Sequence, residues 1–549
     1  MKRVIISVLA LSVSSALLAA PPKFDGARIS ADVKELASDA YEGRSPATAG
    51  EEKTVAYLSR QFAEAGLQPG GDLQDGKRLW TQAVPLLKGD IIGKPQLSLS
   101  SKGTPQVLTQ GQEIAVRAAM NGDAAVAIKD APLVFVGYGV KAPERDWDDF
   151  KGVDLKGKIA VMLINDPDFE TGTGDFDGKG MTYYGRWTYK YEEGARQGAA
   201  GVLIVHETAP ASYGWATVAG SNTNTMFDVV RDDPAAEHPP LEGWIQRDLA
   251  VAMFRRAGLD FEALKRQAQT RDFQPVVLEG ETFSADYAVK TEVITSHNVV
   301  ARLEGNRHPD ETVLYTAHWD HLGVGEPDAG GDRIFNGALD NASGTASLLE
   351  LARGFAKMPR PQRSVVFMAV TAEEKGLLGS EYYATHPLYP LAKTVAMINM
   401  DGMAPYGPSR DFGIYGSAKM ELLDQLKDVA RGWDIRYTPD PLPEAGLFFR
   451  SDHFPFAKRG VPALSYSAGQ DWVEGGVEAG KRASDDYTAK RYHQQGDEWQ
   501  PDWTFAGAAR DLEVVYTLGE QLANSRDWPN WSAEEAFRAV RDASAAERR

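Results

Sequence analysis

The sequence predicts an α/β fold in which helices flank an open mixed sheet and a second, β-rich domain is inserted. From about residue 289 to residue 522, apolar strand-like runs alternate with helical patterns, as in an open sheet covered on both faces. Between residues 131 and 206 the pattern changes to short continuous apolar runs with one intervening helix, which is typical of buried strands. A chain of 549 residues, 43% of them hydrophobic, is long enough to form more than one core.

The first 20 residues have the features of a secretory signal peptide. Lys2 and Arg3 precede an apolar run at residues 4–18, and the small residues Ala19 and Ala20 follow it. This run is shorter than the ~20 residues that span a bilayer, so we expect no stable membrane anchor. The mature chain is predicted to be exported, either to a periplasm or to the extracellular medium.

Composition excludes several classes of partner and chemistry. The chain has no cysteine, which excludes disulfides, thiolate metal ligands and a cysteine nucleophile. Its formal net charge of −18 repels phosphate backbones, so we expect no nucleic-acid partner. The sequence does not predict an oligomeric state.

Two segments precede the apolar runs. In residues 27–70 apolar side chains recur at three- and four-residue steps, which predicts two amphipathic helices. Residues 86–129 mix short alternating runs with Gly and Lys, which indicates strands and turns. The predicted domains are residues 21–130 as the N-terminal part of the main domain, residues 131–281 as the insertion and residues 282–549 as the rest of the main domain.

Acidic and histidine side chains follow predicted strands at the ends where open α/β sheets bind ligands. His318 and Asp320 follow the apolar run 312–317, and residues two apart on a strand can point into one crevice. Asp340 ends a glycine-rich loop, before a predicted helix at residues 345–355. Taken alone, Asp340 would be interpreted as a helix N-cap.

Two further predicted strands also end in acids. Glu373 and Glu374 follow the run 364–370, and Asp401 follows the run 394–400. Adjacent carboxylates at the end of a buried strand repel each other and lose hydration, which a nearby cation would relieve. The alternative for the glutamate pair is a solvated helix start.

With His493, which lies in a polar loop, these residues can hold two divalent cations. Two histidines and three carboxylates, one of them able to bridge, supply nitrogen and oxygen ligands and leave Glu373 free as a general base. Two cations ~3.5–4 Å apart would share a water, lower its pKa and polarise a scissile carbonyl. This ligand mixture suits two Zn²⁺ per chain, and Mn²⁺ or Co²⁺ would also fit.

These motifs resemble those of the M28 family of zinc peptidases, which contains bacterial aminopeptidases and the glutamate carboxypeptidase branch. The matching motifs, in the family's order across roughly residues 296 to 520, are His318-Trp319-Asp320, Asp340-Asn341-Ala342-Ser343-Gly344, Glu373-Glu374, Asn399-Met400-Asp401, Ser451-Asp452-His453-Phe454-Pro455-Phe456 and Tyr492-His493. Residues 27–70, including Glu42-Gly43-Arg44, also resemble the family's opening helices. The insertion resembles a protease-associated domain, which often walls or lids the site in this family.

The resemblance implies a role for each matched residue. The implied ligands are His318 and Asp401 for one zinc, Glu374 and His493 for the other, and Asp340 as the bridge. Asp320 would support His318 without binding metal itself. Glu373 would take a proton from the bridging water and return it to the leaving amine.

Other residues are candidates for the substrate pocket. His453 lies in a family motif but not at the spacing of the last ligand, so we interpret it as lining the pocket. Arg186 in the insertion and Arg450 near the same motif can bind a substrate carboxylate, or they are ordinary surface or packing arginines. The histidines that match no motif are interpreted as ordinary surface or core residues: His206, His238, His297, His308, His321 and His386.

The predicted partners are peptide substrates, and the predicted activity is that of an exopeptidase. An aminopeptidase must hold a free ammonium, which an acidic crevice does well, and the bacterial relatives favour this direction. A carboxypeptidase would instead need a cation such as Arg186 or Arg450. The alternatives from other classes are a glutaminyl cyclase with one zinc, which the complete ligand set argues against, and an inactive receptor-like binding protein, which the competent metal-binding side chains argue against.

Overall fold

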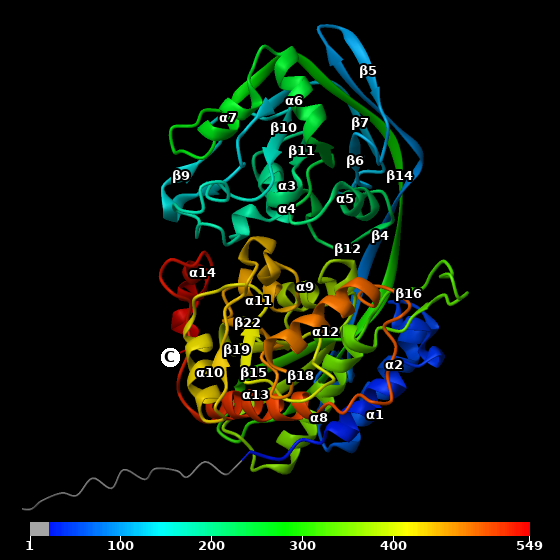
Figure 1. The fold of residues 1–549 in the computed structure, drawn as a ribbon, viewed down its shortest axis with the longest axis vertical. Helices are drawn as coiled ribbons and strands as arrows, with labels where there is room; N and C mark the ends of the chain where they lie inside the picture. Colours follow the sequence, from blue (N-terminus) through cyan, green and yellow to red (C-terminus); the bar gives the residue numbers. More distant parts are fainter. Residues whose placement is uncertain (1–20, 549) are drawn as a thin grey trace, which may run out of the picture.

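The computed structural model describes residues 21–548, which form two lobes joined by two long strands (Figure 1). These strands are β4 (Thr81–Ser101) and β14 (Val276–Leu303), and they pair antiparallel over most of their length. The predicted signal segment lies outside the described residues. Among residues 21–548, no helix is both long and apolar enough to cross a membrane.

The lower lobe in Figure 1 contains the predicted mixed sheet. β15 (His308–His318) lies between β18 (Arg363–Val370) and β19 (Thr394–Met400), and all three strands are parallel. β22 (Ala463–Ala468) continues the parallel order beyond β19, whereas β14 pairs antiparallel with β18. Every residue of β18 and β19 is buried, which explains why their sequences are continuous apolar runs. The predicted fold class is confirmed.

Helices cover both faces of this sheet. One face packs against α1 (Gly26–Leu36), α8 (Gly344–Lys357) and α13 (Ala506–Asn524). The other face packs against α9 (Leu378–Thr385) and α11 (His453–Lys458). Successive side chains of β15 belong to the cores on opposite faces, as the pleat of a strand requires.

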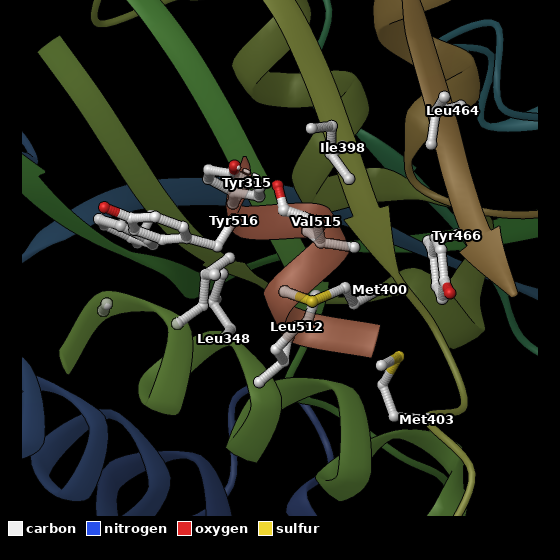
Figure 2. Close-up of a cluster of buried hydrophobic side chains, with 14 of the residues drawn as sticks. Tyr315, Leu348, Ile398, Met400, Met403, Leu464, Tyr466, Leu512, Val515 and Tyr516 are labelled. Atoms are coloured by element: carbon white, nitrogen blue, oxygen red, sulfur yellow. Dashed lines mark hydrogen bonds between the residues drawn. The ribbon is translucent and has the colours of Figure 1, made fainter. Parts of the chain in front are cut away.

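The larger of these cores reaches the end of β19, where the sequence predicts a ligand. Figure 2 shows Tyr315 beside Val515, with Met400 and Leu512 nearer the strand end. The Tyr315 hydroxyl donates a 2.9 Å hydrogen bond to the Val515 carbonyl. Met400, the last residue of β19, is fully buried. Burying an apolar side chain of this size stabilises the fold by ~1.5–3 kcal/mol, so the backbone that carries Asp401 is firmly anchored.

The two predicted opening helices are present as α1 and α2 (Ala49–Glu64). The loop between them carries Arg44, whose buried guanidinium donates to four backbone carbonyls, those of Leu36, Trp319, Asn336 and Gly337. Hydrogen bonds from a charged donor are stronger than neutral ones, so these four bonds hold the opening segment firmly against the loops that follow β15.

The upper lobe contains the strands and the helix predicted between residues 131 and 206. β10 (Ile159–Leu163), β11 (Gly201–His206) and β13 (Glu242–Gln246) are parallel and fully or largely buried, and α3 (Trp187–Arg196) precedes β11. The core of this lobe also contains Leu97, Leu108, Ile114 and Val116. Its packing therefore begins earlier in the chain than residue 131, the predicted start of the insertion.

Ion pairs connect the two lobes. Arg231 of the upper lobe lies 3.5 Å from Glu381 of α9, and Glu192 of α3 accepts a 2.9 Å hydrogen bond from Lys458 of α11. His238 lies between two carboxylates beside this network, with Nδ1 2.7 Å from Glu242 and Nε2 3.0 Å from Asp228. Burial lowers the pKa of His238, but these two carboxylates outweigh burial and raise the pKa to about 10.

We predict that His238 makes the stability of the protein dependent on pH. A histidine whose pKa is raised on folding contributes fully below its unfolded pKa of about 6.5, and the contribution is lost as the pH rises through about 10. The difference in the free energy of unfolding between the unaltered protein and His238→Gln, measured in urea, should therefore be largest near pH ~6 and decline toward pH ~10. The exposed His386, which lies outside this network, provides the control variant His386→Gln. A constant difference for His238→Gln would contradict the prediction.

Candidate metal centre

The structure brings the five predicted ligands together at one edge of the lower sheet. His318 is the last residue of β15, Asp401 is the first residue after β19, and Glu374 lies in a 3-10 turn just after β18. Because these strands are parallel, their carboxyl ends lie at the same edge. Asp340 lies in the turn before α8, and His493 follows α12 (Gly476–Lys490).

Three of these side chains are spaced as ligands of one zinc ion. The Nε2 atom of His318 lies 3.3 Å from Asp340 Oδ1 and 3.3 Å from Asp401 Oδ1. A tetrahedral zinc ion with bonds of ~2.0 Å holds its ligand atoms about 3.3 Å apart. The donor set and its spacing therefore fit zinc at this position.

The remaining two ligands form a second group around the same aspartate. The Nε2 atom of His493 lies 3.1 Å from Asp340 Oδ2 and 3.2 Å from Glu374 Oε2. Asp340 thus faces one group with Oδ1 and the other with Oδ2, as a carboxylate that bridges two cations must. The residues present therefore fit two zinc ions.

Side chains behind the first group fix Asp401. Its Oδ2 accepts a 2.6 Å hydrogen bond from Ser451 Oγ, which in turn accepts one of 2.8 Å from Asn399 Nδ2. The Tyr415 hydroxyl donates a 2.9 Å hydrogen bond to the backbone carbonyl of Asp401. Sequence reasoning assigned no role to Ser451, although it lies in a matched motif. Such contacts orient a ligand and tune its affinity for metal.

Asp320 is buried behind the centre and contacts His318 through its backbone. The Nδ1 atom of His318 lies 3.1 Å from the Asp320 carbonyl oxygen and 3.8 Å from its carboxylate. That carboxylate instead accepts hydrogen bonds from the backbone N–H groups of Glu373, at 3.1 Å, and Glu374, at 3.4 Å. Asp320 thus links the end of β15 to the turn that carries both glutamates.

Asp340 does not cap α8. The N-cap position of α8 belongs to Ser343, and the Asp340 carboxylate faces the two imidazoles. Its turn is held by Asp497, whose carboxylate accepts 3.0 Å hydrogen bonds from the backbone N–H groups of Leu339 and Asp340. Sequence reasoning missed Asp497, because only the folded chain brings it to this turn.

The adjacent glutamates have pKa values shifted in opposite directions. For Glu374, burial and Asp340 raise the pKa, but the imidazoles of His321 and His493 outweigh them and lower it to about 2. For Glu373, burial raises the pKa well above its usual value, and the charges of Asp401 and Glu374 add to this, although His318 acts against them. A permanently ionised ligand next to a group that can take up a proton is the pairing that acid–base catalysis requires.

His321, interpreted from the sequence as an ordinary histidine, belongs to this centre. Its side chain is fully buried, and its Nδ1 lies 2.7 Å from Glu374 Oε1. Its ligand atoms and those of Asp340 and Glu374 lie within 4.8 Å of one another. The sequence indicated a role for His321 only through its position three residues after His318. His321 itself belongs to none of the matched motifs.

A cavity of about 1760 Å³ lies between the lobes and opens onto the centre. Glu373 and His493 line it, as do the two arginines predicted for the pocket, Arg186 and Arg450. The prediction that His453 lines the pocket is wrong. Its side chain is fully buried and packs edge-on against Phe448, with ring centroids 4.6 Å apart.

The shared aspartate leads to a prediction about metal content. Asp340→Ala removes a ligand from both groups, so bound zinc should fall close to zero, whereas His493→Ala should leave one ion per chain. Zinc per chain is measured by atomic absorption after dialysis against metal-free buffer. His297→Ala is the control, since His297 lies outside both groups. Equal zinc losses in the Asp340 and His493 variants would refute the bridging role of Asp340.

Comparison with known proteins connects this geometry to a family. Residues 298–517 match the model for peptidase family M28. A probable zinc metalloprotease of Pyrenophora teres f. teres (strain 0-1) is 42% identical over 103 residues, covering 19% of this chain and 22% of that protein. Aminopeptidase NAALADL1 of Mus musculus is 31% identical over 181 residues, covering 29% of this chain and 22% of that protein. The chain thus spans about a fifth of the length of these curated relatives.

Solved structures also align with the chain over most of its length. An aminopeptidase from Aneurinibacillus sp. strain AM-1 aligns over 92% of this chain and 96% of that chain, with 20% identity and a TM-score of 0.49.

Proposed function

We propose, from the match of residues 298–517 to the model for peptidase family M28, that the chain is a dinuclear zinc exopeptidase that cleaves residues from the N-terminus of peptides. The observation that carries the proposal is the position of Asp340, which offers one oxygen to each of two groups of ligands. The competing interpretation as a glutaminyl cyclase requires only one cation, and it gives the second group of metal ligands no role.

The proposed mechanism assigns each residue a defined task. When bound, two zinc ions lower the pKa of a water and polarise the scissile carbonyl. Glu373 lines the cavity beside both groups, takes the proton of the attacking water and returns it to the leaving amine. Asp320 keeps Glu373 in reach by holding its backbone N–H. Asp401 keeps its position throughout because the buried Ser451 donates a hydrogen bond to its carboxylate.

The N-terminal direction is supported by the name of one relative and by charge. Mouse NAALADL1 is named an aminopeptidase. The residues that line the cavity include Asp440 and Asp486, whose carboxylates attract a free ammonium group. We also propose that the protein is exported to a periplasm or to the medium, as the N-terminal sequence predicts.

A C-terminal direction is the second candidate, and it is supported by two arginines. Within residues 21–548, neither Arg186 nor Arg450 has an ion pair with an acidic side chain, although both line the cavity. Burial is the main cause that lowers the pKa of Arg186 to about 10, and the charge of Arg450 acts in the same direction. A substrate carboxylate would satisfy both.

Replacing the general base should separate catalysis from metal binding. We expect Glu373→Gln to retain its zinc and to lose several orders of magnitude in kcat, because the amide cannot accept the proton. The measurements are steady-state peptide hydrolysis and zinc content on one preparation. Lys375→Gln, in the same turn, is the control and should keep near-normal turnover. Near-normal turnover by Glu373→Gln would refute the assignment of Glu373 as the general base.

Substrate panels should decide the direction. One panel of dipeptides is blocked at the amine and the other at the carboxylate, and each is tested with and without chelator. An aminopeptidase cleaves only the carboxylate-blocked peptides, and Arg186→Gln changes its KM for them little. Cleavage of only the amine-blocked peptides, with a KM at least ~10-fold higher in Arg186→Gln, would establish the C-terminal direction. No cleavage despite bound zinc would favour the cyclase or the receptor-like alternative.

A further inference from the structure

We propose that His321 is a positioning residue that orients Glu374 and thereby sets the zinc affinity of the second group of ligands. The inference rests on the proposed dinuclear centre, since it concerns one of its ligands. His321 lies in the loop that leaves β15, and it is fully buried. Its Nδ1 lies 2.7 Å from Glu374 Oε1, and since an ionised carboxylate can only accept, Nδ1 carries the hydrogen.

The two oxygens of Glu374 face different partners. Oε1 accepts the hydrogen bond from His321, whereas Oε2 lies 3.2 Å from His493 Nε2, on the side of the second cation position. The last torsion of a glutamate side chain is broad and roughly two-fold, so the side chain itself does not fix the plane of its carboxylate. The hydrogen bond to His321 supplies the missing constraint.

The imidazole of His321 is itself held in place. Gly337 lies against it, in a left-handed conformation with φ of 56°, and a Cβ atom there would be 2.5 Å from His321 Cγ. The His493 ring stands edge-on to it at 5.8 Å between centroids. The carbonyl of Gly337 is also one of the four that the buried Arg44 binds. The donor is therefore rigid, which a flexible side chain at this position would not be.

The distances favour positioning over direct ligation. His493 Nε2 lies 3.1 Å from Asp340 and 3.2 Å from Glu374, which is the spacing of tetrahedral ligands. His321 instead meets the far oxygen of Glu374 at 2.7 Å, an ordinary hydrogen-bond distance. Its Nε2 has no hydrogen-bond partner among the residues that the structure describes, so this one bond is the polar contact the side chain makes.

Three variants distinguish the roles of the ring atoms. In His321→Asn, the Nδ2 atom of the amide can occupy the place of the imidazole Nδ1. In His321→Gln, the amide Nε2 atom instead reaches the place of the imidazole Nε2. In His321→Leu, the side chain has the shape of Asn but no hydrogen-bond donor. Removing a partner that orients a metal ligand typically costs about 10–100-fold in affinity. We expect this loss for the second zinc in His321→Leu and His321→Gln, and an affinity within about 3-fold of the unaltered protein in His321→Asn.

The test titrates zinc into the metal-free full chain against a competing chelator and resolves the two binding steps. Urea unfolding of each metal-free variant reports whether it folds, and the comparison of Asn with Gln stands even if the Leu variant does not. The exposed His386→Asn serves as control. Equal affinity in all three variants would overturn the proposal, as would equal loss in all three, which is the result expected of a direct ligand. Peptide hydrolysis by the unaltered protein is measured in parallel, so two bound zinc ions without hydrolysis would refute the proposed function and leave this inference standing.

Discussion

The burial of several carboxylates within contact of one another is the constraint on which the rest of the structure depends. Asp340 and Glu374 share an imidazole partner, and the pKa of Glu373 is raised mainly by burial, with the charge of Asp401 helping to raise it. Taking such groups out of water is expensive unless each has a compensating partner. The imidazoles and the backbone N–H groups are such partners, and the sheet serves to hold them at fixed spacing.

Two of the ligands, Asp401 and Asp340, accordingly have a second contact that does not face the centre. Ser451 holds Asp401, and the backbone N–H of Asp340 is held by Asp497. These partners come from loops that only the folded chain brings together, and the buried Arg44 ties the opening helices to the same loops. The centre is therefore supported by several distant parts of the chain. A local change in any of these loops alters the positions of the ligand side chains.

Local pattern was enough to predict part of this arrangement. His318, Glu374 and Asp401 stand at the ends of continuous apolar runs, and because parallel strands end at one edge, their convergence follows from secondary structure. The role of His321 and the burial of His453 do not follow, since both depend on the direction in which a loop turns. Leu97 and Ile114 precede residue 131 in the chain yet pack in the core of the upper lobe, because strand patterns do not reveal which core a strand joins. Asp497 carried no signal beyond its charge.

The long paired strands β4 and β14 also restrict how the two lobes can move relative to each other. β4 and β14 carry the chain into the upper lobe and back, and they are hydrogen-bonded to each other along that path (Figure 1). Sliding one lobe past the other in the plane of this ribbon would break its ladder, whereas flexing the ribbon out of its plane leaves the ladder intact. The lobes therefore move most easily relative to each other by bending this ribbon out of its plane. The ion pairs Arg231–Glu381 and Lys458–Glu192, which join the two lobes, resist this bending.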